Sequence, residues 1–117
     1  VGSEMCIRDS HTGARTCFGD GLPLGAGFLA HLDMLLRSRN EEMPEGSYTT
    51  TLFAEGKARI AQKVGEEGVE LALARMKDDH CEIANEAADL LFHMMVLLAD
   101  AGMSLDDALE VLKKRHG

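Results

Sequence analysis

The sequence predicts an all-α fold, a helical bundle of four to five helices with a central antiparallel hairpin. Apolar residues recur at helical spacing in several segments of the chain. Two long segments of this kind are separated by only a short polar break, which favours an antiparallel pair of helices. No segment has a convincing strand pattern.

The N-terminal half is predicted to hold one full helix and one short one. Residues 28–39 place five apolar residues at helical spacing, and a basic last turn suits the helix dipole. Residues 40–47 contain a proline and a glycine, which should break this helix. Thr49 is then a plausible N-cap for a short helical turn that ends at Phe53.

The centre of the chain predicts the helical hairpin. Residues 59–76 combine apolar positions with good helix formers, and the polar residues 77–80 leave room only for a tight turn. Residues 83–99 are apolar on almost every side, so this second arm is expected to be central and buried. Gly102 should end it, and Ser104 should cap a final helix.

Length and charge limit the classes of function. A chain of 117 residues fits one modest domain. Its formal charge of −8 argues against a nucleic-acid-binding surface, and an anionic substrate would need a cationic mediator such as a metal ion. Only 4% of the residues are aromatic although several helices have apolar faces, so we expect the bundle to be completed by dimerisation as a homodimer.

Cysteine number and hydropathy predict a cytoplasmic protein. Cys6, Cys17 and Cys81 are odd in number and widely spaced, so they form no disulfide framework; Cys81 is most simply a buried thiol. No apolar run approaches the length of a membrane span, and the first residues lack the apolar core of a signal peptide. We therefore expect no membrane contact.

The first 27 residues are predicted to lie outside the folded domain, which we place at residues 28–117. Residues 1–10 resemble a translated sequencing-adapter tail and are interpreted as non-native; a genuine flexible terminus is the alternative. Residues 11–27 are rich in glycine and lack apolar periodicity, which is typical of a loop or linker.

Four acidic residues of the predicted hairpin carry the strongest functional signal. Glu67 and Glu70 are three residues apart on the first arm, and Glu86 and Asp89 are three apart on the second, so each pair shares a helix face. If the chain turns at Asp78, Glu70 lies level with Glu86 across the hairpin, about 12 Å from the turn. Glu67 lies level with Asp89, about 16 Å from the turn. All four carboxylates should then meet within one helical turn.

Two interpretations of these carboxylates are open. They could be ordinary solvated acids, which is the usual fate of glutamate. However, carboxylates packed together on a partly buried helix repel one another unless a cation neutralises them. A ligand set of oxygen atoms favours Mg²⁺ over Zn²⁺, with Mn²⁺ as an alternative.

Basic residues precede the carboxylates on the same helix. Arg59 and Lys63 are four residues apart and share the face of Glu67. They are candidates for binding phosphate oxygens, or they form an exposed ladder of ion pairs. Lys57 is a weaker candidate of the same kind.

Two neighbouring residues have open roles. Glu66 is a further ligand, a base for an attacking water, or a plain partner of Lys63. His93 follows Asp89 by four residues and could form a hydrogen bond with it, or it is simply a packed side chain.

Several motifs resemble one enzyme family, phosphoribosyl-ATP pyrophosphohydrolase. The stretches that carry the resemblance are PEGSYT at 44–49, AEGKARIAQKVGEEGVE at 54–70, NEAADLLFH at 85–93 and KRH at 114–116. The likeness runs from about residue 28 to the end of the sequence. The ExxE and ExxD pairs alone indicate only the wider all-α, MazG-like superfamily of nucleoside triphosphate pyrophosphohydrolases.

The resemblance implies a function and a set of site residues. The reaction would be Mg²⁺-dependent hydrolysis of phosphoribosyl-ATP to phosphoribosyl-AMP and pyrophosphate, the second step of histidine biosynthesis. The metal ligands would be Glu67, Glu70, Glu86 and Asp89. Glu66, or one of the ligands Glu67 and Glu70, would take the proton of the attacking water, and Lys57, Arg59 and Lys63 would bind the substrate.

Residues 11–18 resemble the end of another enzyme of that pathway, phosphoribosyl-AMP cyclohydrolase. In many bacteria that enzyme is fused ahead of the pyrophosphohydrolase. Ser10 stands where that family has its first zinc-binding cysteine, and only Cys17 remains. We therefore expect this stretch to be a remnant without a zinc site and without cyclohydrolase activity.

Two other functions remain open from the sequence. A housecleaning pyrophosphohydrolase for other nucleotides would use the same metal site with a different base pocket. A non-catalytic helical interaction module would show no stabilisation by Mg²⁺.

Overall fold

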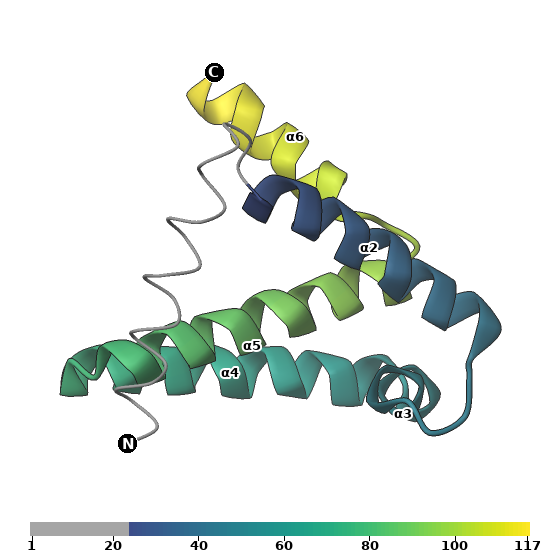
Figure 1. The fold of residues 1–117 in the computed structure, drawn as a ribbon, viewed down its shortest axis with the longest axis horizontal. Coiled ribbons are helices and arrows are strands. Elements are labelled where there is room, and N and C mark those ends of the chain that lie inside the picture. The colour runs from purple at the N-terminus through teal and green to yellow at the C-terminus, as the bar shows by residue number, and fades with distance from the viewer. Residues whose placement is uncertain (1–23) are drawn as a thin grey trace.

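The computed structural model describes residues 24–117, which form five helices and no strand (Figure 1). The helices are α2 (Leu24–Glu42), α3 (Tyr48–Glu55), α4 (Lys57–Lys77), α5 (His80–Asp100) and α6 (Leu105–His116). The all-α prediction is therefore confirmed. The predicted tail at 1–10, the remnant at 11–18, Cys6 and Cys17 lie outside the described residues.

Helix α2 is longer at both ends than the sequence predicted. Residues 24–27, predicted as linker, form its first turn. At the other end the helix passes the predicted break and continues to Glu42, whose carboxylate accepts a hydrogen bond from the Ser38 hydroxyl at 2.7 Å. It stops at Met43, which has a left-handed φ of +50° directly before Pro44.

Helix α3 is capped by Ser47 and not by Thr49, so that part of the prediction was wrong. The Ser47 hydroxyl oxygen accepts the Thr50 N–H at 3.4 Å, whereas Thr49 is buried in the first turn. The helix also runs two residues past Phe53. It ends at Gly56, whose φ of +94° is rarely adopted by residues with a side chain, and α4 begins at the next residue.

The predicted antiparallel hairpin is present as α4 and α5, which lie side by side in Figure 1. Only Asp78 and Asp79 connect them. Asp78 adopts the left-handed conformation with φ of +58°, and the Asp79 carboxylate caps α5 by accepting the Glu82 N–H at 3.1 Å. This tight turn fixes how the two long helices are aligned.

The core lies where α2 and α3 cover the end of the hairpin far from this turn (Figure 1). Its buried residues are Leu36, Leu52, Phe53, Ile60, Met95, Val96, Ala99 and Leu105. These residues come from all five helices, and Leu105 is the contribution of α6. The core therefore holds one end of the hairpin, and among residues 24–117 the end near the turn is formed by the packing of α4 on α5.

Helix α5 is buried in only part of its length, contrary to the sequence prediction. Cys81 is buried as predicted, and most residues from His93 to Ala99 are buried or partly buried. Ala84, Ala87 and Ala88 are exposed because only α4 packs beside that part of the helix within the described residues. No single helix in residues 24–117 is long and apolar enough to cross a membrane, although α5 and α6 pass that length and composition requirement as a pair bent by 108°.

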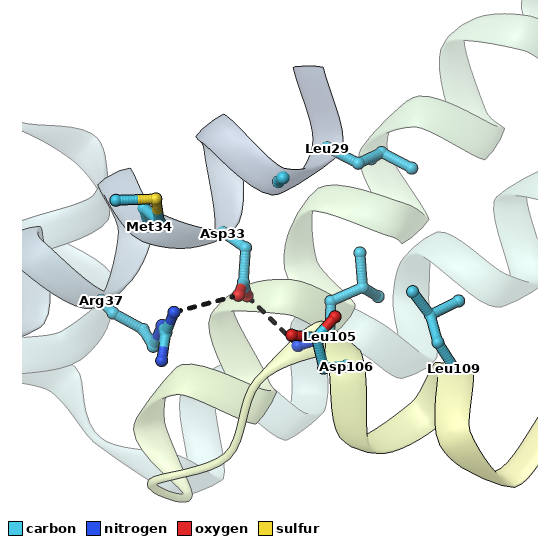
Figure 2. A pocket seen from close by; sticks show the side chains of 8 residues that line it. Leu29, Asp33, Met34, Arg37, Leu105, Asp106 and Leu109 are labelled. Atoms are coloured by element: carbon cyan, nitrogen blue, oxygen red, sulfur yellow. Dashed lines mark hydrogen bonds and ion pairs between the residues drawn. The ribbon is translucent and has the colours of Figure 1, made fainter. Parts of the chain in front are cut away.

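Helix α6 is tied to α2 by the buried carboxylate of Asp33 (Figure 2). One oxygen accepts the Leu105 N–H at 3.2 Å, and the other lies 3.5 Å from the Arg37 guanidinium. The contact satisfies a backbone donor at the start of α6 that would otherwise lack a partner within its helix. A cavity of about 480 Å³ lies beside it, between α2 and α6.

Replacing Asp33 by alanine is expected to lower the free energy of unfolding by about 1–3 kcal/mol, because the buried Leu105 N–H would lose its acceptor. Asp33→Asn keeps an acceptor oxygen and should lose less. Urea unfolding measures both values. Asp106→Asn, at an exposed neighbouring acid, is the control. Equal losses for the alanine and asparagine variants would contradict this explanation.

Candidate functional site

The predicted carboxylates meet on the facing sides of α4 and α5. Oxygen atoms of Glu67, Glu70 and Glu86 all lie within 4.8 Å of one another. Asp89 is outside this group of three, but it lies close by, because its charge raises the pKa of Glu67 and its hydrogen bond with Glu86 raises the pKa of Glu86. The helical spacing and the two-residue turn together bring about this arrangement.

Burial is distributed differently from the prediction. The sequence suggested that the two acids of α5 are the buried ones, but Glu86 is half-buried and Asp89 is exposed. The buried acid is Glu67 of α4, which is 6% exposed. Its Oε2 atom is buried without a hydrogen-bond partner among residues 24–117. A buried carboxylate oxygen in this state is unfavourable unless another group binds it.

The electrostatics of the cluster are unfavourable without a cation. Burial, followed by the neighbouring Glu70, raises the pKa of Glu67 above its ordinary value. The same two causes raise the pKa of Glu86 to about 7. Like charges held this close destabilise one another, and a hard divalent cation with oxygen ligands would relieve the repulsion. The residues present therefore fit such a metal.

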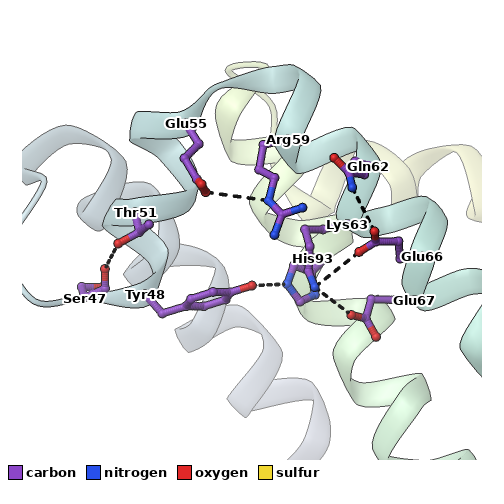
Figure 3. A network of polar contacts seen from close by, with 10 residues as sticks. All are labelled: Ser47, Tyr48, Thr51, Glu55, Arg59, Gln62, Lys63, Glu66, Glu67 and His93. Atoms are coloured by element: carbon purple, nitrogen blue, oxygen red, sulfur yellow. Dashed lines mark hydrogen bonds and ion pairs between the residues drawn. The ribbon is translucent and has the colours of Figure 1, made fainter.

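Lys63 joins the carboxylate cluster to the end of α4 near α3 (Figure 3). Its ammonium lies 3.5 Å from Glu67 Oε1 and 3.6 Å from Glu66 Oε1. Burial lowers the pKa of Lys63, but the electrostatic influence of Tyr48 and Glu67 outweighs it and the net shift is upward. Lys63 is therefore a stable positive charge at the edge of the acidic cluster.

The other predicted cations lie further toward the start of α4. Arg59 lies 3.8 Å from the Glu55 carboxylate, and Lys57 is exposed in the first turn. Both side chains are on the same end of the helix as Lys63. Their role in binding substrate stays a prediction.

Glu66 is not one of the three converging carboxylates. It accepts a hydrogen bond from Gln62 at 3.0 Å and pairs with Lys63. The hydrogen bond from Gln62 is the main cause that lowers the pKa of Glu66 below its ordinary value. The geometry matches the partner role for Glu66 among the three roles considered from the sequence, while its role as a base stays a prediction.

His93 contacts Asp89, but through the backbone and not through the carboxylate. Its Nδ1 lies 2.7 Å from the Asp89 carbonyl oxygen, and its Nε2 lies 3.1 Å from the Tyr48 hydroxyl. Residue spacing does not reveal the part played by Tyr48, because Tyr48 lies 45 residues from His93 in the chain. The available signal was its place in the PEGSYT stretch as the chain's single tyrosine.

Comparison with known proteins identifies the family. Residues 29–116 match the phosphoribosyl-ATP pyrophosphohydrolase family. The chain belongs to this family. The match covers every predicted site residue, namely Lys57, Arg59, Lys63, Glu66, Glu67, Glu70, Glu86 and Asp89.

Curated relatives support the same assignment. The chain is 51% identical over 106 residues to the histidine biosynthesis bifunctional protein HisIE of Escherichia coli K12, covering 91% of this chain and 52% of that protein. It is 48% identical over 109 residues to the protein of the same name from Vibrio vulnificus, covering 91% and 51%. The chain thus spans about half the length of the curated relatives it matches.

Proposed function

We propose that this chain hydrolyses phosphoribosyl-ATP to phosphoribosyl-AMP and pyrophosphate, the second step of histidine biosynthesis, in the cytoplasm. The observation that carries the proposal is the convergence of three carboxylates around a buried Glu67 oxygen that has no partner among the described residues, in a chain of this family. Lys63 at its edge supplies positive charge for a phosphate.

We also propose that Mg²⁺, with Mn²⁺ as an alternative, is held by Glu67, Glu70, Glu86 and Asp89. The convergent oxygen atoms and the raised pKa values of Glu67 and Glu86 support this assignment. When bound, the ion would neutralise phosphate charge and make an attacking water more acidic.

The chain's own residues would hold the phosphates and take up the proton. Lys63 and Arg59 would bind phosphate oxygens and Lys57 would assist at the helix end. The water oxygen bonds to the α phosphorus as the bond from that phosphorus to the oxygen bridging it to the β phosphorus breaks. The bridging oxygen then leaves as part of pyrophosphate. The water proton passes to a carboxylate, for which Glu66, Glu67 and Glu70 are the candidates.

A homodimer is the proposed assembly. An apolar stripe on α4, formed by Val69, Leu73 and Met76, is 55–81% exposed, and it runs along the half of the hairpin that α2 and α3 do not cover. Exposed apolar stripes of this kind are typical of protein contact surfaces. We expect Leu73→Glu to shift the protein toward monomer, as measured by light scattering.

Pyrophosphate release from a panel of nucleotides tests the activity. With Mg²⁺ present, phosphoribosyl-ATP should be hydrolysed with a kcat/KM at least about 100-fold above those of ATP, dCTP and dUTP, because only it carries the second phosphoribosyl group. Preference for dCTP or dUTP would indicate the housecleaning alternative. An absence of release from every nucleotide would contradict the proposed function.

A further inference from the structure

Tyr48 is an exposed aromatic residue at the edge of the candidate site. It is the first residue of α3 and is 54% exposed, although both its hydroxyl and its ring have specific contacts. A singly exposed tyrosine is ordinary by itself. The contacts of Tyr48 indicate that its orientation is set by the protein.

The hydroxyl of Tyr48 is fixed by a chain of hydrogen bonds to α5. A carbonyl oxygen only accepts, so the 2.7 Å contact to Asp89 requires His93 Nδ1 to carry a hydrogen. In the neutral ring Nε2 is then an acceptor, and the Tyr48 hydroxyl donates to it at 3.1 Å. His93 is 5% exposed, so this anchor cannot swing away easily.

The ring of Tyr48 is supported on one side and open on the other. Its centroid lies 6.4 Å from that of Phe92 with the two planes 24° apart, an offset stack. His93 meets Tyr48 edge-on at 6.0 Å. Phe92 packs on one side of the ring and His93 lies at the hydroxyl end, yet Tyr48 is still 54% exposed, so we infer that the opposite face of the ring is the open one.

Lys63 links this ring to the phosphate end of the site. Its ammonium lies 3.5 Å from Glu67, and Tyr48 is close enough to influence the pKa of Lys63. Figure 3 draws the Tyr48–His93 hydrogen bond and the Lys63 contacts to Glu66 and Glu67 as parts of one polar network. In a nucleotide the ribose separates the phosphates from the base, so phosphates held at Lys63 bring the base near the aromatic group.

We propose that the open face of the Tyr48 ring stacks against the adenine base of the substrate, with His93 and Phe92 holding the ring in place. The proposal rests on the proposed function, because it assigns the base-binding surface of that same site. Stacking of a base on an aromatic side chain typically changes affinity by about tenfold or more. A ring fixed in advance loses little freedom when the base binds.

Tyrosine fluorescence tests the contact without catalysis. The chain has one tyrosine and no tryptophan, so its emission comes from Tyr48 alone. AMP added with Mg²⁺ should quench this emission in a saturable manner, whereas ribose 5-phosphate, which lacks the base, should not. Equal quenching by both compounds, or none by AMP, would overturn the proposal.

Kinetics of matched variants provide the second test. Tyr48→Leu should raise KM for phosphoribosyl-ATP about tenfold with little change in kcat, and Tyr48→Phe, which keeps the ring, should recover most of the loss. Inhibition by pyrophosphate, which has no base, should be unchanged in both variants. Thr51→Val removes an exposed α3 hydroxyl and serves as the control.

The outcomes separate the two proposals. An unchanged KM in Tyr48→Leu, or an equal weakening of pyrophosphate inhibition, would overturn the stacking role while leaving the activity intact. Selective quenching by AMP without any hydrolysis of phosphoribosyl-ATP would overturn the proposed function and support the base contact.

Discussion

Glu70→Gln should lower pyrophosphate release from phosphoribosyl-ATP by about 100-fold or more while making the metal-free protein more stable to heat. Glu70 contributes one of the three convergent carboxylates and is exposed at the surface, so the substitution removes a charge without disturbing the core. Loss of a residue that supports a metal site commonly costs about 10–100-fold in affinity or activity, and loss of a proposed ligand should cost at least as much.

The gain in heat stability follows from the charges of the cluster. After burial, Glu70 contributes most to the raised pKa values of Glu67 and Glu86. A neutral amide at this position removes that repulsion, so the melting temperature without Mg²⁺ should rise, and Mg²⁺ should raise it little further. Glu110→Gln, at an exposed acid of α6, should change neither property. Full activity in Glu70→Gln would contradict the ligand assignment.

Stabilisation by Mg²⁺ is expected to increase as the pH rises through 7. In the metal-free protein the pKa of Glu86 is raised from 4.5 to about 7, so between these values the folded state binds more protons than the unfolded state. Its contribution to stability is fully present below pH 4.5 and is lost as the pH rises through 7. Mg²⁺ binds the deprotonated carboxylates, so it competes with protons at low pH and acts fully at higher pH.

Urea unfolding with Mg²⁺ or with a chelator, at several pH values between about 5 and 8, measures this effect. At a concentration 100 times its dissociation constant, the ion should add about 2.7 kcal/mol to the free energy of unfolding. The Glu86→Gln variant has an amide that does not titrate in place of the carboxyl group, so the stability of its metal-free form should depend less on pH. A stabilisation by Mg²⁺ that is equal at pH 5 and 8 would argue against a carboxylate site.

The helices could be predicted from the sequence because their apolar spacing is strong, but several of their ends could not. Ser47 and Thr49 both carry a hydroxyl able to cap a helix, and only the path of the backbone decides which one accepts the Thr50 N–H. The end of α2 at Glu42 likewise depends on the left-handed backbone that Met43 adopts directly before Pro44. Which residue caps or ends a helix depends on small differences in free energy, and residue type alone does not determine them.

The carboxylate cluster could be predicted because it needs only helical geometry and a short turn. The sequence could not predict which of the four acids is buried, because burial depends on which helices cover each face of the hairpin. Glu67 faces the packed side of α4, whereas Asp89 lies on a part of α5 that α2 and α3 leave open. The Tyr48–His93 hydrogen bond is likewise a product of tertiary packing, since it joins helices that are far apart in the sequence.

The two-residue connection at Asp78 and Asp79 also has a consequence for the order of folding. Contacts between α4 and α5 are local in sequence near this turn, and local contacts form rapidly because little chain entropy is lost in closing the loop. We therefore expect the hairpin to form before α2 packs across it. The acidic side chains would then meet before the core is complete, so divalent cations should accelerate refolding as well as stabilise the folded protein.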